Sequence, residues 1–490
     1  MKKPFLMLTL TCLLITAFKP LFAKKLKAVF SYAAFNTLQD GPYLETYLLV
    51  DGKSVNYVSN AENLYQAVIE VTLIFKQNDS VITFKKYELN SPAAADTSKI
   101  EFNFLDQQRV LLPNGTYDLE LTISDKNAAG EPFTNVERIT IDFPNDKISI
   151  SDIQTAESVK KAEKTGILTK SGYDIIPYII NYYPKNAEKI TFYAEIYNAA
   201  TILGKDEAFL INYYIESWEN QMPLSQFNRM KRETARDVNA FIGEFVLKEL
   251  PTGNYNLVVS IKDKNNETKS IGKLFFYRYN PDLNYAVQDF QNIDLSTTFV
   301  SQINTPDSII DCINSLYPIS TELERVYARN NLKRDNLKEM QKFFYGFWHS
   351  RDALNPANAW QAYAAEVQKV NKIYSTGNRK GYETDRGRVY LQYGAPNSVT
   401  KSEFEPSAYP YEIWHYYSLR NQSNRKFVFY SHEFATNDYE LIHSDALGEI
   451  NDPRWQIKIH KRDTPTHSLD PEDAEKHWGG RIHDNYKYPR

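Results

Sequence analysis

Alternating apolar and polar residues characterise the first 280 residues of the chain. In "LPNGTYDLELTISDKN" (112–127), Tyr117, Leu119, Leu121 and Ile123 occupy every second position, which is typical of a strand with one buried face. A Pro-x-Gly turn precedes these residues and Asp-Lys-Asn follows them. Because Pro, Gly, Asn and Asp favour turns, both flanks predict the ends of a strand.

The same pattern returns in "LPTGNYNLVVSIKDKN" (250–265), which shares nine of sixteen residues with the first copy. Average residue usage would give about one match. Tyr255 takes the place of Tyr117, and similar alternating strands precede each copy. The repeat therefore predicts two tandem immunoglobulin-like β-sandwiches, at residues 24–148 and 149–280.

After residue 280 the apolar period changes from two residues to about 3.6. Three segments begin with residues that cap helices and continue with apolar residues at helical spacing: 305–317, 320–331 and 335–350. In a fourth, Asn355 caps and Pro356 takes the first helical position. Its apolar stripe consists of Trp360, Tyr363, Ala364, Val367, Val370 and Tyr374. We expect a helical connector over residues 281–375.

The segment "GYETDRGRVYLQYGAPN" (381–397) has the signals of a short helix. Thr384 and Asp385 are residue types that start a helix, Gly394 is suited to end it, and Pro396 prevents its return. A catalytic role for the Thr-Asp pair is the alternative interpretation. Apolar residues also alternate along 389–393, so a strand is a second interpretation of this segment.

Two strands are predicted after this segment, in "EIWHYYSL" (412–419) and "KFVFYSHEF" (426–434), the first of which contains Trp414. A helix followed by paired strands predicts an α+β domain over residues 376–455. The fold class is therefore multidomain: two sandwiches, a helical connector and a carboxy-terminal α+β domain.

Arginines and a glycine inside the predicted helix suggest a binding surface. Gly387 costs about 1 kcal/mol relative to alanine in a helix, so another backbone or a ligand is expected to come close. Arg386 and Arg388 on either side are suited to forked contacts with a carboxylate or phosphate, although pairing within the chain is an equal alternative. We expect these two arginines to be exposed recognition residues, together with Tyr382.

The order of three pieces resembles a known family. "FWHSRDALNPANAW" (347–360), "GYETDRGRVYLQYGAPN" and "YEIWHYY" (411–417) are similar to the GWxTD domain of secreted bacterial envelope proteins of Bacteroidota type. Gly381, Thr384 and Asp385 match the motif, and Tyr382 stands where the family has tryptophan. The resemblance, over about residues 285–450, implies an envelope protein with sandwich modules ahead of the domain, and it implies no established activity.

The predicted topology has a weaker likeness to a second family. A capped helix, a Gly-x-Pro exit and a Trp-x-Tyr hairpin look like the small outer-membrane assembly lipoproteins of the SmpA/OmlA kind. This analogy implies a docking module, and a shared fold does not by itself establish a function.

Both ends of the chain have distinct compositions. Residues 1–23 have lysines at 2 and 3, an apolar core and a final small residue, which predicts a cleaved signal peptide. The core is shorter than the roughly 20 residues of a membrane span. Residues 456–490 are polar and charged, which predicts a poorly ordered tail. We therefore expect a periplasmic or outer-membrane-associated protein.

Charge and residue types exclude several classes of function. The formal net charge of −4 argues against a nucleic-acid partner. The eight histidines show no His-x-x-x-His pair, and Cys312 is the one cysteine left after the signal peptide, so neither a metal site nor a disulfide is predicted. Cys312 itself is expected to be a small buried hydrophobe. No phosphate loop, dinucleotide glycine motif or Gly-x-Ser-x-Gly elbow is present, and no cofactor is expected.

Two functional hypotheses follow from the sequence. The first is a non-enzymatic scaffold or adaptor that binds a protein partner in an envelope assembly. The second is an enzyme or sugar-binding protein that acts on envelope polysaccharide, because paired carboxylates for glycoside hydrolysis are defined in space and not by spacing. The 35 tyrosines suit wet interfaces and sugar stacking alike, although strands also favour tyrosine.

Overall fold

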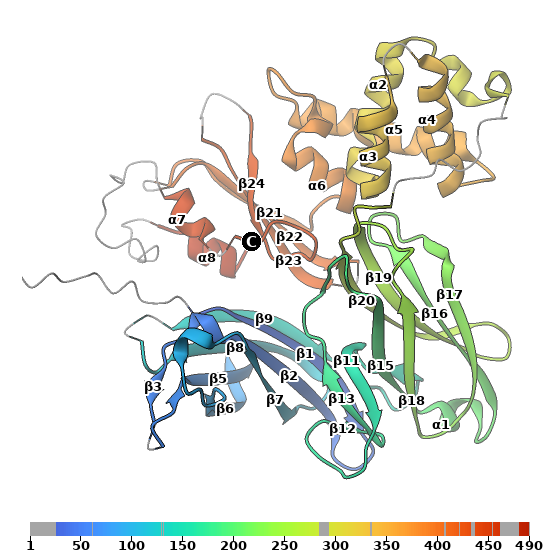
Figure 1. Ribbon diagram of the computed structural model, residues 1–490. Coiled ribbons are helices and arrows are strands. Elements are labelled where there is room, and N and C mark those ends of the chain that lie inside the picture. Colours follow the sequence, from blue (N-terminus) through green and yellow to red (C-terminus); the bar gives the residue numbers. More distant parts are fainter. Residues whose placement is uncertain are drawn as a thin grey trace, which may run out of the picture. The chain divides into compact units, whose positions relative to one another are not determined.

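A computed structural model describes most of the chain (Figure 1). The described residues are 26–60, 62–128, 130, 132–283, 294–333, 336–405, 408–420, 422–432, 437–452, 454–460 and 480–489. The predicted signal peptide lies outside them. By its contacts the chain divides into two units: residues 1–30, 47–107 and 117–139 form one, and residues 31–46, 108–116 and 140–490 form the other.

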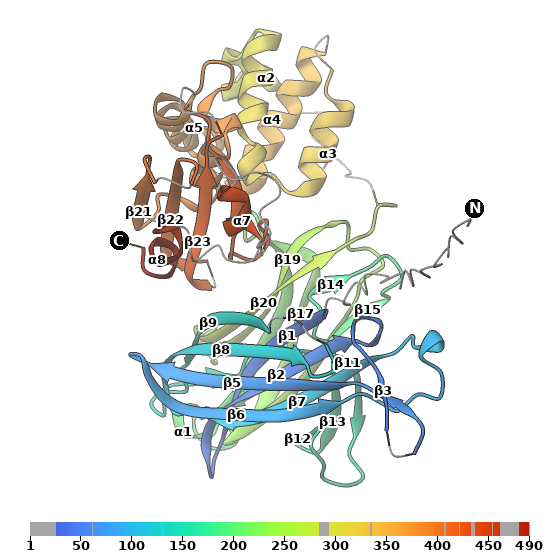
Figure 2. The same ribbon diagram turned by 90° about the vertical axis from the view of Figure 1, so that its left-hand side faces the viewer.

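The first β-rich region contains two main sheets. Strand orders are β1-β2-β7 in the three-stranded sheet and β6-β5-β8-β9 in the four-stranded sheet, and β3 and β4 form a separate pair. Figure 2 shows the strands of the four-stranded sheet running alongside one another. The bounds are β1 (Ala28–Thr37), β2 (Gly41–Asp51), β3 (Val58–Ser59), β4 (Tyr65–Gln66), β5 (Val68–Gln77), β6 (Ser80–Asn90), β7 (Asn103–Leu111), β8 (Gly115–Asp125) and β9 (Phe133–Ile141).

The second β-rich region also has two sheets, which share one hydrophobic core. One sheet has the order β10-β15-β11-β13-β12 with β18 also paired to β15, and the other has the order β14-β20-β19-β16-β17. Phe192 and Phe241 of the first sheet pack with Phe209 and Leu257 of the second. The bounds are β10 (Ser149–Ile150), β11 (Gln154–Lys161), β12 (Thr169–Lys170), β13 (Tyr173–Pro177), β14 (Tyr182–Tyr183), β15 (Lys189–Tyr197), α1 (Ala199–Leu203), β16 (Ala208–Ser217), β17 (Pro223–Thr234), β18 (Val238–Val246), β19 (Gly253–Lys262) and β20 (Thr268–Arg278).

The two β-rich regions share part of their strand order, and the second has β10, β12, β13 and β14 in addition. The order β6-β5-β8-β9 corresponds to β17-β16-β19-β20, and β1-β2-β7 corresponds to β11-β15-β18. The two copies of the sequence repeat form β8 and β19, which occupy the same place in their sheets. Tyr255, at the start of β19, donates from its hydroxyl to the carbonyl of Pro251 at 3.1 Å. This contact has the form of the tyrosine corner of immunoglobulin-like domains.

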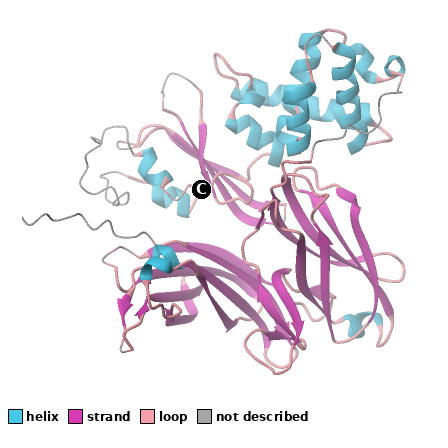
Figure 3. Cartoon of the chain, in the orientation of Figure 1, coloured by secondary structure: helices cyan, strands magenta, loops and turns pink. Residues whose placement is uncertain are grey.

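Helices follow the β-rich regions, and they begin near the predicted caps. The hydroxyls of Thr305 and Thr321 accept from backbone N–H groups of the first turns of α2 and α3, and Thr321 completes a capping box with Glu324. The side chain of Asn336 accepts from the backbone N–H of Glu339 and so caps α4, and Pro356 is the first residue of α5. Helices α2, α4 and α5 gather side by side (Figure 3). The bounds are α2 (Pro306–Ser315), α3 (Glu322–Asn331), α4 (Leu337–Arg351) and α5 (Pro356–Tyr374).

The predicted α+β segment contains one helix and one antiparallel sheet of order β21-β22-β23-β24. Helix α5 joins it to the helices before it, because Trp360 packs in the core of α2 and α4 while Val370 packs in the core of the sheet. The bounds are α6 (Asp385–Tyr393), β21 (Ser398–Ser402), β22 (Tyr411–Leu419), β23 (Gln422–Tyr430) and β24 (Glu440–Ser444).

The described parts of the tail differ from the prediction of poor order over 456–490. Helices α7 (Trp455–Ile459) and α8 (Ile482–Lys487) are formed. Trp455, Ile459 and Ile482 are buried in a core with Tyr411 and Ile413 of β22. These three apolar residues anchor the short helices. They are scattered among polar residues, so the composition of the segment did not predict their burial. Across the described ranges, no helix combines the length and the apolar character needed to span a membrane.

Candidate functional site

Two glycines of the 381–397 segment bring three stretches of backbone together. Gly381 starts a short 3₁₀ turn, and a Cβ atom there would lie 2.2 Å from the carbonyl oxygen of Val370 in α5. A Cβ atom on Gly387 in α6 would lie 1.8 Å from the carbonyl oxygen of Gly381. The prediction that another backbone comes close to Gly387 is therefore confirmed, and that backbone belongs to the chain itself.

Thr384 is the helix cap that its position predicted. Its hydroxyl oxygen accepts from the backbone N–H of Gly387 at 3.1 Å and donates to the carbonyl of Gly381 at 2.7 Å. Thr384 is buried, with 1% of its surface exposed. Asp385 occupies the first turn, where a negative charge is favourable, and its carboxylate accepts from the N–H of Leu441 at 2.8 Å. Residues 385–393 are thus a helix and not a strand, and both polar side chains serve its attachment.

Gly394 ends α6 as predicted. Its φ of 85° is one that residues other than glycine rarely adopt, and its N–H donates to the carbonyl of Tyr390 at 2.7 Å. Its own carbonyl accepts from the hydroxyl of Tyr416 in β22 at 2.8 Å. Pro396 follows in the connection to β21. The exit from the helix is therefore fixed on both sides.

Arg386 is buried, so the exposure that we predicted for it is wrong. Only 3% of its surface is exposed. One terminal nitrogen, Nη1, donates to the carboxylate of Glu412 at 2.9 Å, and the other donates to the backbone and side-chain oxygens of Asn437 at 2.7 Å. The guanidinium also lies over the rings of Tyr374 and Tyr439, at 5.2 and 4.3 Å from their centroids. It is part of the core of the domain.

Trp414 belongs to the same buried cluster. Its indole is 1% exposed, and its Nε1–H donates to the second carboxylate oxygen of Glu412 at 3.0 Å. Lys401 of β21 also contacts Glu412, at 2.8 Å. Glu412 thus receives a guanidinium, an indole N–H and an ammonium, which offset the cost of burying its charge.

Arg388 is also paired within the chain, and its predicted exposure is likewise wrong. Its two terminal nitrogens contact the two carboxylate oxygens of Glu449 at 2.9 and 2.7 Å, a forked ion pair. Tyr393 donates from its hydroxyl to the same carboxylate at 2.8 Å. Burial lowers the pKa of Arg388, but the charge and hydrogen bond of Glu449, together with Tyr393 and Asp385, raise it by more, so the net shift is upward.

Tyr382 points into the protein and does not form an exposed binding surface. It is 5% exposed, and its hydroxyl donates to the carboxylate of Asp311 in α2 at 2.6 Å. Its backbone N–H donates to the side-chain oxygen of Asn371 in α5 at 3.2 Å. Burial and Asp311 both raise the pKa of the phenol. The hydroxyl that replaces an indole at this position therefore has a defined partner.

Sequence reasoning missed the acids that complete this arrangement. Asp311, Glu412 and Glu449 lie 71, 26 and 61 residues from their partners Tyr382, Arg386 and Arg388. One signal was available, because Glu412 lies two residues before Trp414 and therefore on the same face of the strand. An acid at such a position in a strand indicates a buried charge that needs a cation.

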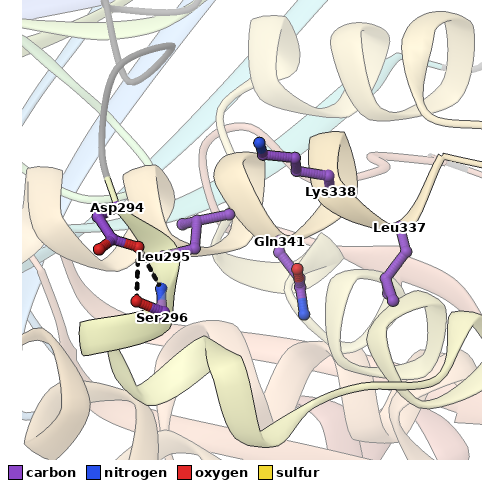
Figure 4. A pocket seen from close by; sticks show the side chains of 6 residues that line it. All are labelled: Asp294, Leu295, Ser296, Leu337, Lys338 and Gln341. Carbon is purple, nitrogen blue, oxygen red and sulfur yellow. Dashed lines mark hydrogen bonds between the residues drawn. The ribbon is translucent and has the colours of Figure 1, made fainter.

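A shallow pocket of about 380 Å³ lies between α4 and the turn η3 (Leu295–Thr297). Most of its polar groups are engaged: the carboxylate of Asp294 accepts from the N–H and the hydroxyl of Ser296, as Figure 4 shows. Gln341 donates to the carbonyl of Ile303 at 2.9 Å. The pocket offers no convergent set of unpaired polar groups.

Metal-binding and nucleophilic side chains show no site in the described part of the chain. No three residues of the types His, Cys, Asp and Glu come together there in a way that would hold a metal ion. His467 and His477 lie outside the described residues. Burial raises the pKa of the half-buried Cys312 thiol to about 11, which opposes formation of the nucleophilic thiolate.

Comparison with solved structures gives likenesses to β-rich modules. Fibronectin(III)-like modules of Clostridium thermocellum CbhA match at 10% identity, covering 53% of this chain and 99% of theirs, with a TM-score of 0.15. A putative β-galactosidase from Bacteroides fragilis matches at 8% identity, covering 52% and 34%, with a TM-score of 0.18. A Bacteroides uniformis β-glucuronidase matches at 10% identity, covering 56% and 32%, also with a TM-score of 0.18. The chain thus spans about a third of the length of these two enzymes.

Comparison with curated proteins gives no match. The family model of the GWxTD domain matches residues 291–459. This range includes the helices α2 to α5 as well as α6 and the sheet, and it contains the joint built by Gly381, Thr384 and Gly387. Residues 291–459 therefore match the GWxTD domain, and a mostly β-sheet region precedes them.

Proposed function

We propose that this protein is a non-enzymatic binding or scaffold protein of the cell envelope, in which the GWxTD domain is a rigid docking module. One observation carries the proposal: the polar side chains of the motif bond to groups within the domain itself. Thr384 caps α6, while Arg386 and Arg388 pair with Glu412 and Glu449. The two ion pairs fasten α6 to the sheet and to the connection after β24, and the close approach of Gly381 to Val370 adds the contact with α5, as expected for a structural joint.

The β-rich region is proposed to form two tandem immunoglobulin-like sandwiches that act as spacer or binding modules. The part of the strand order that the two regions share and the equivalent positions of β8 and β19 support this arrangement. The tyrosine-corner contact of Tyr255 supports it further. Tandem modules of this kind present edges and loops without requiring a catalytic centre.

Partner contact is proposed at the edge of the sheet of the GWxTD domain. Strand β21 is an edge strand of the sheet among the described residues, and we propose that a strand from a partner pairs with its outer side. Large apolar side chains lie on or near it: Val399, Phe404 and Tyr417 are 37%, 84% and 59% exposed. Aromatic groups of this kind are common anchors at protein interfaces.

The envelope location rests on the amino-acid sequence of residues 1–23. Fractionation of cells should place the mature chain in the periplasmic or outer-membrane fraction, and amino-terminal sequencing should find a start near Lys24. Recovery of the full-length chain in the cytoplasm would contradict the proposed location.

Photo-crosslinking in cells tests the scaffold proposal. A photoreactive phenylalanine analogue at position 404 or 417 should give a discrete crosslinked product with one envelope protein. The matched control is the same analogue at Met230, which is 68% exposed on β17 and should give no such product. Absence of a product from both test positions, or the same product from position 230, would refute docking at β21.

A further inference from the structure

A polar cavity of about 440 Å³ lies beside β19 in the larger unit of the chain. Its size is within the range of small-molecule sites. Its polar lining consists of Ser151, Asp152, Gln221, Asn256, Lys273 and Arg420. It shares no residue with the motif of the GWxTD domain, and the proposed scaffold function does not use it.

Asn256 presents an unpaired acceptor at this cavity. Its side chain is buried, with 2% of the residue exposed, and its amide nitrogen donates to the carboxylate of Glu216 at 2.9 Å. Because a carboxylate only accepts, this bond fixes which end of the amide is nitrogen. The amide oxygen is buried and has no hydrogen-bond partner among the described residues. Such an atom favours a ligand that can donate a hydrogen bond.

Arg420, in the turn between β22 and β23, presents an unpaired donor at the same cavity. Its guanidinium lies over the rings of Trp218 and Tyr393, at 4.6 and 4.9 Å from their centroids. One terminal nitrogen donates to the carbonyl of Glu219 at 3.2 Å, whereas Nη1 is buried and has no partner within the described residues. No carboxylate of the described chain forms an ion pair with this guanidinium at 4 Å or less. A cation held in this way favours an anion.

The other charges of the cavity leave this preference in place. Lys273 is paired with Glu216 at 2.6 Å. Asp152 accepts from the N–H of Ala34 at 2.7 Å, and its carboxylate can accept from further hydroxyls. The hydroxyl of Ser151 already donates to the carbonyl of Asp152 and accepts from the N–H of Glu195. Burial lowers the pKa of Arg420, and the carboxylates of Glu219, Glu449 and Glu216 act on its charge at longer range. Water would satisfy Asn256 but would leave Nη1 of Arg420 without an anionic hydrogen-bond acceptor. The pairing of one cation with one neutral acceptor points to a ligand that has both a carboxylate and hydroxyls.

We propose that this cavity binds a sugar acid of the uronic type, either free or at the end of a polysaccharide. The carboxylate contacts Nη1 of Arg420, and a hydroxyl donates to the amide oxygen of Asn256. A single sugar ring fits the volume of about 440 Å³. The proposal is independent of partner docking at β21, because the two sites have no residue in common.

Titration calorimetry on the full mature chain tests the proposal with glucuronate and galacturonate, and with glucose and galactose as neutral counterparts. Uronates should bind at least about tenfold more tightly than the neutral sugars, because a buried guanidinium recognises the carboxylate. Oligogalacturonates distinguish a chain end from a free sugar acid by their tighter binding.

Two variants and one control locate the site. Arg420→Gln and Asn256→Leu should each weaken uronate binding by about tenfold or more, a loss of about 1.4 kcal/mol. Arg232→Gln removes an exposed arginine of β17 and should leave binding unchanged. If Asn256→Leu fails to fold, Arg420→Gln, which lies in a turn, decides the outcome.

Three results would overturn the proposal: no uronate binding at millimolar concentration, equal affinity for neutral sugars, or unchanged binding by Arg420→Gln. The first would mean that the cavity holds only water. The second would mean that the guanidinium does not select the ligand, and the third would place any uronate site elsewhere on the chain.

Discussion

Strands β8 and β19 carry the two copies of one sequence repeat, and they differ in what covers them. In β8, Tyr117, Leu119 and Leu121 are buried while the residues between them are half-exposed. In β19 nearly every residue is buried on both faces. The inner faces share the same apolar pattern, so the difference lies entirely in the outer face.

The outer faces have matching differences in sequence. Asp118, Glu120 and Thr122 in β8 correspond to Asn256, Val258 and Ser260 in β19. Two of the three residues on the open face of β8 are charged, whereas all three on the covered face of β19 are uncharged. The comparison shows that the apolar residues common to both copies form the inner, core-facing side of each strand, whereas most of the residues that differ lie on the outer side and match its exposure. Helix α6 of the GWxTD domain is a second example of a covered element, because its Arg386 is buried and paired with Glu412.

The largest effect is expected where two backbones meet. Gly387→Ala would place a methyl group 1.8 Å from the carbonyl oxygen of Gly381, so we expect a loss of roughly 4 kcal/mol or more in unfolding free energy. Gly377→Ala is the control, because nothing lies within 4 Å of its added Cβ. Urea unfolding measures both, and equal stability of the two variants would refute the close contact of α6 with Gly381.

The next effect compares a covered ion pair with an open one. Arg386→Ala leaves the buried Glu412 without its guanidinium and should cost about 3–5 kcal/mol. Arg138→Ala removes the partner of Asp118 on the open face of β8, where the arginine side chain is 46% exposed, and should cost about 0–1 kcal/mol. Thermal melting of the two variants gives the comparison, and similar shifts in Tm would show that burial does not separate the pairs.

Two reciprocal substitutions at corresponding positions of β8 and β19 test whether the outer face of β19 tolerates a charge. Asn256→Asp places a second carboxylate beside Glu216 in a buried position and should destabilise by about 2–3 kcal/mol at pH 7. Asp118→Asn, at the corresponding open position, should change stability by about 0.5 kcal/mol. The penalty of Asn256→Asp should shrink at acidic pH, where the new carboxyl is protonated. A penalty that is independent of pH would indicate a packing effect instead of charge.

The smallest effect concerns the cap of α6. Thr384→Ala removes the acceptor for the N–H of Gly387 and should lower the unfolding free energy by about 1 kcal/mol. Thr384→Ser keeps the hydroxyl and serves as the matched control, with a smaller loss. Chemical denaturation distinguishes them. Crosslinking from position 404 should persist in the folded alanine variant, and its loss at full stability would assign Thr384 a direct role in binding.

The amino-acid sequence was informative where the responsible contacts are short in range. The caps at Thr305, Thr321 and Thr384 bond to N–H groups within three residues of themselves, and such contacts follow from spacing. The glycine at 394 ends α6 through its own backbone angle. Alternation along β8 and β19 and the repeat itself also need no distant partner, so these elements could be predicted from the residues alone.

Only the tertiary structure decided how the polar side chains are used. Glu412, which pairs with Arg386, belongs to β22, and Glu449, which pairs with Arg388, lies in the connection after β24. Asn256 and Arg420 line one cavity although they are far apart in the chain. An exposed arginine and a buried, paired one have the same local pattern, because burial depends on which elements pack around the side chain. The sequence by itself therefore determined the strands, the helix α6 and its ends, whereas packing determined that the motif is a joint and that the outer face of β19 lines a polar cavity.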